Sequence, residues 1–502
     1  MKKRLFRAAA VLFSAASLSA ALALHGSAAY EEKLVGYLGD VNADMSVNIA
    51  DAVLLTQYLE GTAQLPAEGY PDMDAGGTLT VSDLTMLKQL LLTQGVPIPI
   101  YDQVWVEDPP EVPIESPVQA LNPTLPSTGE TQILMFTVEF PDCHFHEGYS
   151  TEQVWNLAFG PEDKTSDAYP LESITAYYER ASYGKLHVNG DVYTYTARHN
   201  IDYYVDNTDT LVEEVLAAFD SQIDYHKYDV NSDNEMDTLI LALPKDAGTE
   251  NWWPCSGGYY GWKKYDNVRA SNLLIGGWAL DDRAGFNSTW IHEMGHGMGL
   301  PDYYMYENYS GNDCYGLNGD AGWLMMDDAY GDMCCFDKLM YGWYNEDDVQ
   351  VYEGGTQTFT LKSSQREAGC ILIPRYDDGG YLTEYFMLEY VTHEGNNATW
   401  WLFKDGGIRV LHCDAEICEG YWGPEFTWNN YGMYYDTSNQ KQRVLRLVND
   451  NGGFFKSGAY IDSNTTGFKW YDRSGYQTVN PMLTISIGDL VNGEYTITIS
   501  EQ

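Results

Sequence analysis

Residues 289–304 read T-W-I-H-E-M-G-H-G-M-G-L-P-D-Y-Y and contain the pattern H-E-x-x-H-x-x-G-x-x-D. On a helix, His292 and His296 are four residues apart and project from one face, where two imidazoles can bind one zinc ion. Gly299 permits a sharp turn after the helix, so Asp302 can return as a third ligand. Three protein ligands leave the fourth position of a tetrahedral site open, as in catalytic zinc sites.

The residue beside the first histidine supplies the acid–base chemistry. The Glu293 carboxylate can take a proton from zinc-bound water, whose pKa the metal lowers to about 7, and pass it to a leaving amine. A bare H-E-x-x-H also occurs on ordinary polar helix faces, but its extension to Gly299 and Asp302 favours a zinc site. A metzincin-like site should also have a methionine turn beneath the metal, and residues 323–327 (W-L-M-M-D) offer two candidates, of which Met326 is preferred over Met325. The alternative is that either methionine only fills the core.

Composition limits the remaining function classes. The chain has 502 residues, 28 Lys and Arg against 73 Asp and Glu, and a formal net charge of −45. This length predicts several domains, and the charge argues against nucleic acid or an anionic membrane as a partner. Residues 1–29 combine a basic start, an apolar run over 8–24 and small residues at 27–29, which predicts a cleaved secretory signal peptide rather than an anchor. No later segment is apolar enough to span a membrane.

The chain has eight cysteines and no C-x-x-C pattern. An exported chain permits disulfides, but eight cysteines allow 105 pairings. Buried free thiols are equally compatible with a chain of this length.

An internal repeat follows the signal peptide. Residues 40–51 and 72–83 both carry oxygen-bearing side chains at the spacing of a calcium-binding loop. Two departures should weaken calcium binding: Met45 stands where the first loop requires its turn glycine, and Gly76 replaces a carboxylate in the second. An apolar helical run follows each loop. The predicted calcium ligands are Asp40, Asn42, Asp44, Asn48 and Asp51 in loop one, and Asp72, Asp74, Thr80 and Asp83 in loop two.

With its aspartate at the twelfth loop position and one helix per loop, the segment over residues 31–94 resembles a dockerin, the module that attaches enzymes to cohesin scaffolds of cellulosomes. The resemblance implies two calcium ions, a cohesin partner, and contact faces that begin near residues 49–50 and 81–82. A calcium-stabilised EF-hand pair without a partner is the alternative. Residues 96–129, rich in proline, predict an extended linker with no core of its own.

The segment over residues 131–344 resembles the immune inhibitor A family of secreted zinc metallopeptidases. That resemblance implies a metzincin-like α/β fold and assigns the zinc-ligand and general-base roles to His292, His296, Asp302 and Glu293. The stretches that carry it are I-L-M-F-T-V-E-F-P-D at 133–142, Y-Y-E-R-A-S-Y-G-K-L at 177–186, the zinc motif with L-P-D-Y at 300–303, and the methionine turn.

A third calcium-like loop lies inside this segment and runs into the apolar strand predicted over residues 238–243. Calcium there would brace the strand; an Asx-rich turn without metal is the alternative. Its candidate ligands are Asp229, Asn231, Asp233 and Asp237.

The expected organisation is therefore a signal peptide (1–29), an all-α EF-hand-like dockerin (30–95), a linker (96–129), an α/β zinc peptidase domain (130–346) and a β-sandwich-like domain (347–502). The last assignment rests on period-two strands predicted over residues 356–361, 385–390, 407–412, 483–487 and 495–499. The predicted function is a secreted zinc endopeptidase on a cellulosomal or cell-surface scaffold, acting on protein or peptide. Two rivals remain: a glycoside hydrolase, which needs paired carboxylates that nothing local marks, and a non-catalytic or carbohydrate-directed protein on a peptidase fold. Tryptophans that could stack on sugar rings in the last domain are Trp400, Trp401, Trp422 and Trp428.

Overall fold

The structure is a computed structural model of the chain, and it separates into two compact units, residues 1–111 and 112–502. The signal peptide predicted over residues 1–29 lies outside the described part. Among the described helices, none is both long and apolar enough to cross a membrane. The described residues are 30–67, 69–74, 77–93, 95–105, 112–146, 148–250, 252–259, 261–304, 324–376, 380–421, 423–429, 442–448 and 453–502.

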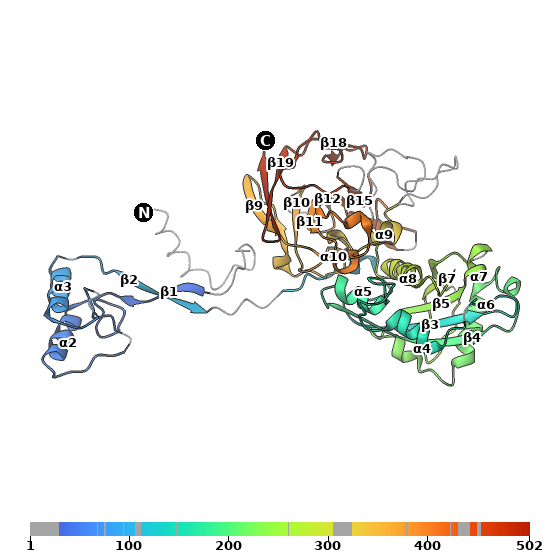
Figure 1. The fold of residues 1–502 in the computed structure, drawn as a ribbon, viewed down its shortest axis with the longest axis horizontal. Coiled ribbons are helices and arrows are strands. Elements are labelled where there is room, and N and C mark those ends of the chain that lie inside the picture. The colour runs from blue at the N-terminus through green and yellow to red at the C-terminus, as the bar shows by residue number, and fades with distance from the viewer. Residues whose placement is uncertain are drawn as a thin grey trace. The chain divides into compact units, whose positions relative to one another are not determined.

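The first unit is built on helices α2 (Ile49–Leu59) and α3 (Val81–Leu92), which follow the two calcium-like loops (Figure 1). Each helix begins with a capping box, in which the N-cap side chain and the aspartate three residues later satisfy backbone N–H groups at the helix start. The helices pack through a small core that includes Leu55 and Leu87, both fully buried. The repeat seen in the sequence is therefore a pair of loop–helix units around one core.

The first part of the predicted linker belongs to this unit. Strand β2 (Pro99–Trp105) pairs antiparallel with β1 (Tyr30–Tyr37), which joins the two ends of the repeat. The proline density suggested an extended segment, and the segment is extended. However, the backbone of β2 bonds to a partner strand, so it is not a free spacer.

The second unit begins with a five-stranded sheet in the order β4-β3-β5-β7-β6. Strands β3, β4, β5 and β7 run parallel, and the edge strand β6 runs antiparallel to β7. The strands are β3 (Gly129–Glu139), β4 (Leu186–Thr196), β5 (Thr238–Pro244), β6 (Cys255–Gly258) and β7 (Asn272–Trp278), and the helices are α4 (Thr151–Phe159), α5 (Ile174–Ala181), α6 (Thr208–Phe219), α7 (Lys245–Glu250) and α8 (Arg283–Gly297).

Both faces of this sheet are covered, which explains the continuous apolar run of β5. Ile240 and Ala242 point into a core cluster shared with α8, whereas Leu239, Leu241 and Leu243 point into a second cluster shared with α6. The period-two alternation of a strand thus places helix α8 and its histidines on one face of the sheet.

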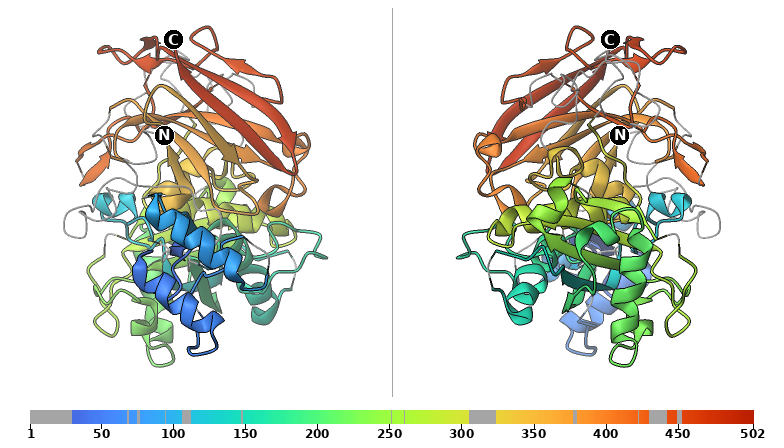
Figure 2. Two further views of the ribbon diagram at one scale, coloured as in Figure 1. Left: turned by 90° about the vertical axis from the view of Figure 1, so that its left-hand side faces the viewer. Right: turned by 90° about the vertical axis from the view of Figure 1, so that its right-hand side faces the viewer.

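The last third of the chain forms two further sheets, of five strands in the order β15-β12-β11-β10-β8 and of four strands in the order β16-β19-β20-β9. They lie in separate layers (Figure 2) and share one apolar cluster. Five of these strands coincide with those predicted from sequence: β9 (Thr356–Leu361), β11 (Glu384–Val391), β12 (Gly407–Asp414), β19 (Leu483–Val491) and β20 (Glu494–Glu501). The remaining strands are β8 (Val349–Val351), β10 (Cys370–Pro374), β13 (Ile417–Glu419), β14 (Pro424–Phe426), β15 (Leu445–Leu447), β16 (Tyr460–Ile461), β17 (Trp470–Tyr471) and β18 (Gln477–Val479), and the short helices before them are α9 (Met325–Asp328) and α10 (Cys335–Met340).

The boundary expected near residue 346 is not a boundary between separate cores. Strand β11 is buried along its whole length, with Tyr385 and Met387 in the cluster of helix α8 and Phe386 and Leu388 in the cluster between the two last sheets. Helix α10 contacts β11. A sheet that is apolar on both faces must be covered on both sides, and here the core around helix α8 covers one of them.

Residues 112–129 also differ from the expected linker. Ile114, Val118 and Leu125 are buried in the same core cluster as helix α8. The Ile114 N–H donates to the Tyr344 carbonyl at 3.0 Å, and the buried Ser127 hydroxyl donates to the Tyr341 carbonyl at 2.9 Å. We call residues 112–129 the strap. Its prolines limit helix formation, but its apolar side chains are buried against the second unit.

Candidate metal centre and active-site pocket

The H-E-x-x-H motif lies on helix α8, as its spacing predicts. The helix begins at an Asp282 cap, whose side chain accepts from the Gly285 N–H, and it ends at Gly297. The chain then turns at Gly299, whose φ of +108° is a conformation that disfavours residues with a Cβ atom. This turn brings Asp302 back to the C-terminal end of the helix.

Three ligand atoms converge there. The Asp302 Oδ1 atom lies 2.9 Å from His292 Nε2 and 3.3 Å from His296 Nε2. All three side chains are largely buried, and they form one of the groups of described residues able to hold a metal ion. Two imidazoles and one carboxylate form a donor set suited to zinc, so the residues present fit the predicted ion.

The other ring nitrogens of the two histidines face backbone carbonyl groups. His292 Nδ1 lies 2.6 Å from the Met325 carbonyl oxygen, and His296 Nδ1 lies 2.8 Å from the Leu300 carbonyl oxygen. A carbonyl accepts but cannot donate, so each Nδ1 carries the proton and each Nε2 atom faces Asp302. These carbonyl groups fix the imidazoles in the orientation that a metal ligand requires.

Electrostatics at the site favour a positive centre. Burial lowers the pKa of His296, but its hydrogen bond and charge interaction with Asp302 outweigh burial and raise that pKa to about 9. Burial raises the pKa of Asp302, yet hydrogen bonds with both histidines hold it well below the ordinary aspartate value. The carboxylate therefore remains ionised and attracts a cation, which agrees with the chemistry of the donor set.

The segment predicted as a methionine turn lies against the C-terminal part of helix α8. A Cβ atom built on Gly295, which lies between the two histidines, would be 2.3 Å from the sulfur of Met326. Both Met325 and Met326 are fully buried, but Met325 contributes its carbonyl group to His292. Of the two, the side chain of Met326 is therefore the one that packs on the helix backbone beside the ligands.

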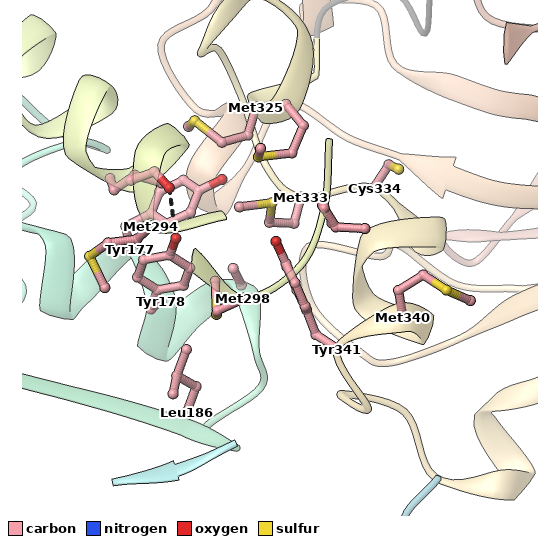
Figure 3. Packing of buried hydrophobic residues seen from close by; sticks show 14 of the residues in the cluster. Tyr177, Tyr178, Leu186, Met294, Met298, Met325, Met333, Cys334, Met340 and Tyr341 are labelled. Carbon is pink, nitrogen blue, oxygen red and sulfur yellow. Dashed lines mark hydrogen bonds between the residues drawn. The ribbon is translucent and has the colours of Figure 1, made fainter. Parts of the chain in front are cut away.

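A dense apolar layer supports the same helix (Figure 3). Met294 of α8 and Met298, the residue directly after this helix, belong to one buried cluster with Met333 and other residues of the segments that follow. In this layer the Tyr178 hydroxyl of α5 donates to the Ile291 carbonyl at 2.7 Å. These contacts fix the position of helix α8 and therefore limit the positions that His292 and His296 can adopt.

The ligands and Glu293 line a pocket of about 890 Å³. Its walls come from the strap, from the segment that enters edge strand β6, from α8 with its following turn, and from strand β14 with the residues after it. The lining residues are Leu121, Asn122, Pro123, Thr124, Trp253, Pro254, Cys255, Ser256, His292, Glu293, His296, Gly297, Gly299, Leu300, Pro301, Asp302, Tyr304, Pro424, Glu425, Phe426 and Asn429.

Glu293 and Cys255 are both pocket residues. Burial and the nearby charge of Glu293 raise the pKa of the Cys255 thiol to about 11. In the metal-free site the thiol is therefore neutral at ordinary pH. Glu293 is the pocket carboxylate that follows the first candidate ligand, His292, directly in the sequence.

Sequence reasoning missed the walls of this pocket. The strap nevertheless carries a signal: Ile114, Val118, Leu121 and Leu125 recur at helical spacing within the proline-rich stretch, and the segment Pro117–Leu121 is a short 3-10 helix. The Leu125 N–H donates to the Gly297 carbonyl at 3.0 Å, at the end of α8. Nothing local marks Trp253 or Glu425, because only the fold brings these residues to the metal ligands.

The two dockerin-like loops have similar internal hydrogen bonding. In loop one, the Asp40 carboxylate accepts from the backbone N–H groups of Asp44 and Met45. In loop two, the Asp72 carboxylate accepts from the Gly77 N–H, and Asp72, Asp74 and Asp83 form a group able to hold a metal ion.

The remaining predicted ligands have structural roles at the helix starts. The Asn48 and Thr80 side chains cap α2 and α3, accepting from Ala50 N–H and Ser82 N–H. Asp51 and Asp83 are fully buried and accept backbone N–H groups of their own loops. Asn42 lies in loop one, where its side chain donates to Asp44.

The third loop has the same internal pattern as loop one. The Asp229 carboxylate accepts from the N–H groups of Asp233 and Asn234, four and five residues later, and the Asn231 amide donates to Asp233. Asp237 is buried, and its Oδ1 atom has no hydrogen-bond partner among the described residues. An unpartnered buried carboxylate oxygen beside this loop fits a calcium ligand.

The cysteine and tryptophan alternatives can now be compared with the structure. All seven cysteines in the described ranges are free thiols; Cys314 lies outside them. Trp401 is exposed, but Trp400 packs on Tyr330 and Trp428 is partly buried against the core. Trp422 is outside the described residues. Of the four candidate sugar-stacking tryptophans, the described ones therefore present one exposed ring, Trp401, and do not form a flat aromatic surface.

Comparison with known proteins identifies the N-terminal module. Residues 38–92 match the family model for the dockerin type I domain, which confirms that prediction. No curated protein matches the chain. Among solved structures, the crystal structure of catalytically inactive OgpA from Akkermansia muciniphila in complex with an O-glycopeptide (glycodrosocin) substrate is similar over 58% of this chain and 90% of that chain, with 10% identity and a TM-score of 0.20. A likeness at this level carries no argument about fold or function.

Proposed function

We propose that this chain is a secreted zinc-dependent endopeptidase with a metzincin-like catalytic domain and a β-sandwich-like C-terminal region. The convergence of His292, His296 and Asp302 on one point, beside Glu293 in an open pocket, is the observation that carries the proposal. The pocket is large enough for a peptide segment. We further propose two calcium ions in the dockerin loops and one in the loop that begins at Asp229.

The residues of the pocket have separate roles in the proposed peptide hydrolysis. His292, His296 and Asp302 would hold the ion, and a zinc ion supplies Lewis acidity when bound. The Glu293 carboxylate accepts a proton from the attacking water and donates it to the nitrogen of the leaving amine. The antiparallel edge strand β6 and strand β14 form walls along which a substrate backbone can be oriented.

The dockerin is proposed to attach this activity to a cohesin module of an extracellular scaffold such as a cellulosome. Large apolar side chains are exposed at matching places near the starts of its two helices, Ile49 on α2 (74% exposed) and Val81 on α3 (68% exposed). Exposed apolar groups on so small a module indicate a protein interface. These are the faces at which the dockerin resemblance places the cohesin.

The test separates metal ligation from proton transfer. Glu293→Gln keeps the size of the side chain but removes the proton acceptor, so zinc should stay bound while peptide hydrolysis falls by about two to four orders of magnitude. Asp302→Ala removes a ligand, so zinc affinity should fall, and added zinc should restore at most part of the activity. Metal content by elemental analysis and turnover of a quenched peptide are measured together.

Replacing either ligand histidine by alanine should abolish both zinc binding and activity. The matched control is His187→Ala, because His187 is an exposed histidine whose partner is Glu179 and which does not line the pocket. Full activity in Glu293→Gln, or unchanged zinc affinity in Asp302→Ala, would show that these roles are wrong. A parent protein that binds zinc yet cleaves no peptide or protein would refute the peptidase proposal itself.

A further inference from the structure

One carboxylate of the pocket has no role in the proposed chemistry. Glu425 lies on strand β14 and pairs through its backbone with Cys418 of β13. Its side chain is exposed, lines the pocket, and forms no ion pair or hydrogen bond with a described residue. A Cβ atom built on Gly420 would lie 2.4 Å from Glu425 Cδ, so the carboxyl group rests against the backbone of its own hairpin.

The other two acidic residues of the pocket are accounted for. Asp302 is paired with two imidazoles, and Glu293 is assigned to proton transfer. The described residues that line the pocket include no lysine or arginine. Glu425 is therefore the pocket carboxylate that has neither a cationic partner among the described residues nor a role in the proposed chemistry, and it adds a negative potential that a cationic substrate side chain would neutralise.

A second feature of the pocket suits the same group. Trp253 lines the segment that enters edge strand β6, and its side chain is 71% exposed. The long apolar stem of lysine or arginine packs well on an aromatic ring, and the cationic end interacts favourably with the ring face. The net charge of −45 also favours the approach of basic peptides over acidic ones.

We propose that Glu425 determines substrate specificity, selecting peptides that place a lysine or arginine side chain in the pocket near the scissile bond. This inference rests on the proposed peptidase function. Glu425 acts by pairing with the substrate cation and takes no part in bond cleavage. Because the pair is partly exposed to water, its contribution is modest, and we expect about a two- to fivefold preference for a basic over a neutral residue at the selected position.

The test uses the full-length, zinc-loaded protein and a series of quenched peptides. Each peptide carries lysine, arginine, glutamine or glutamate at one of the positions flanking the cleavage site, and kcat/KM is measured for every member. In Glu425→Gln the ratio of kcat/KM for basic over neutral peptides at the selected position should fall about two- to fivefold, and in Glu425→Lys the order of basic and acidic peptides should reverse.

The matched control is Glu419→Gln, which removes the same charge from strand β13 of the same hairpin at an exposed residue that does not line the pocket. This variant should keep the preference of the parent, which separates a local contact from the overall charge of the chain. A parent that cleaves peptides without preferring basic residues, or a Glu425→Gln variant that keeps the full preference, would overturn the assignment of Glu425. A parent that cleaves none of the peptides would instead overturn the peptidase function.

Discussion

Replacing Met45 by glycine should strengthen calcium binding by dockerin loop one. Met45 is the sixth residue of that loop and has a φ of +66°, and Gly77 at the same place in loop two has a φ of +73°. The left-handed conformation costs an L-residue about 1–2 kcal/mol. Met45 pays this cost in the folded loop because its N–H must reach the Asp40 carboxylate, at 2.9 Å.

The size of the effect follows from two opposing terms. Glycine removes the left-handed cost, but it loses about 0.5–1 kcal/mol more conformational entropy on folding. The Met45 side chain is 46% exposed, so little packing is lost. The net gain is about 0.5–1 kcal/mol, which corresponds to a two- to fivefold lower Kd for calcium if loop folding and binding are coupled.

The reciprocal variant is Gly77→Ala. A Cβ atom at Gly77 has no neighbour within 4 Å, so only the backbone conformation opposes the change. Calcium titration with a competing chelator, on the full chain carrying Glu293→Gln to suppress self-cleavage, should show tighter binding for Met45→Gly and weaker binding for Gly77→Ala. Equal affinities in both variants and the parent would show that the sixth position does not limit calcium binding.

Two other changes test the second unit. Gly295→Ala should lower both thermal stability and zinc content, although alanine is normally the better helix former, because its Cβ atom would overlap the sulfur of Met326. Adding Met326→Ala should recover part of the loss. A Gly295→Ala variant as stable as the parent would contradict this packing. Burial raises the pKa of Asp414 to about 7, so the folded protein favours the protonated form of this side chain. The parent should therefore lose stability relative to Asp414→Asn as pH rises from about 4 to 7. Melting temperatures measured across that range should show a gap that widens with pH, whereas a constant gap would rule out this titration.

The convergence of the three candidate metal ligands could be predicted from the sequence because its geometry is local. His296 lies four positions after His292 on one helix, and one glycine turn returns Asp302, so no long-range contact has to be known. The calcium loops are local for the same reason. Strands such as β9 and β20 were equally predictable, because alternation of apolar residues specifies a half-buried strand without its partners.

The pocket walls depend on the pairing of distant segments, which sequence periodicity does not encode. Glu425 is 132 positions beyond Glu293 and reaches the pocket because the sheet of β10, β11 and β12 packs on the core that holds α8. The strap was misjudged for a different reason. Its proline content predicts an extended backbone, but whether the strap is buried depends on the apolar side chains between the prolines.

The strap also bears on which part of the chain can work alone. The Leu125 N–H donates a hydrogen bond to the Gly297 carbonyl oxygen. The Val118 side chain would lie 3.1 Å from a Cβ atom built on Gly299, the residue at which the chain turns back toward Asp302. A protein that begins at residue 130 would lack these contacts and one wall of the pocket. The compact unit that holds the candidate site is therefore residues 112–502 rather than residues 130–346, since the strap and the C-terminal sheets complete the same core and the same pocket.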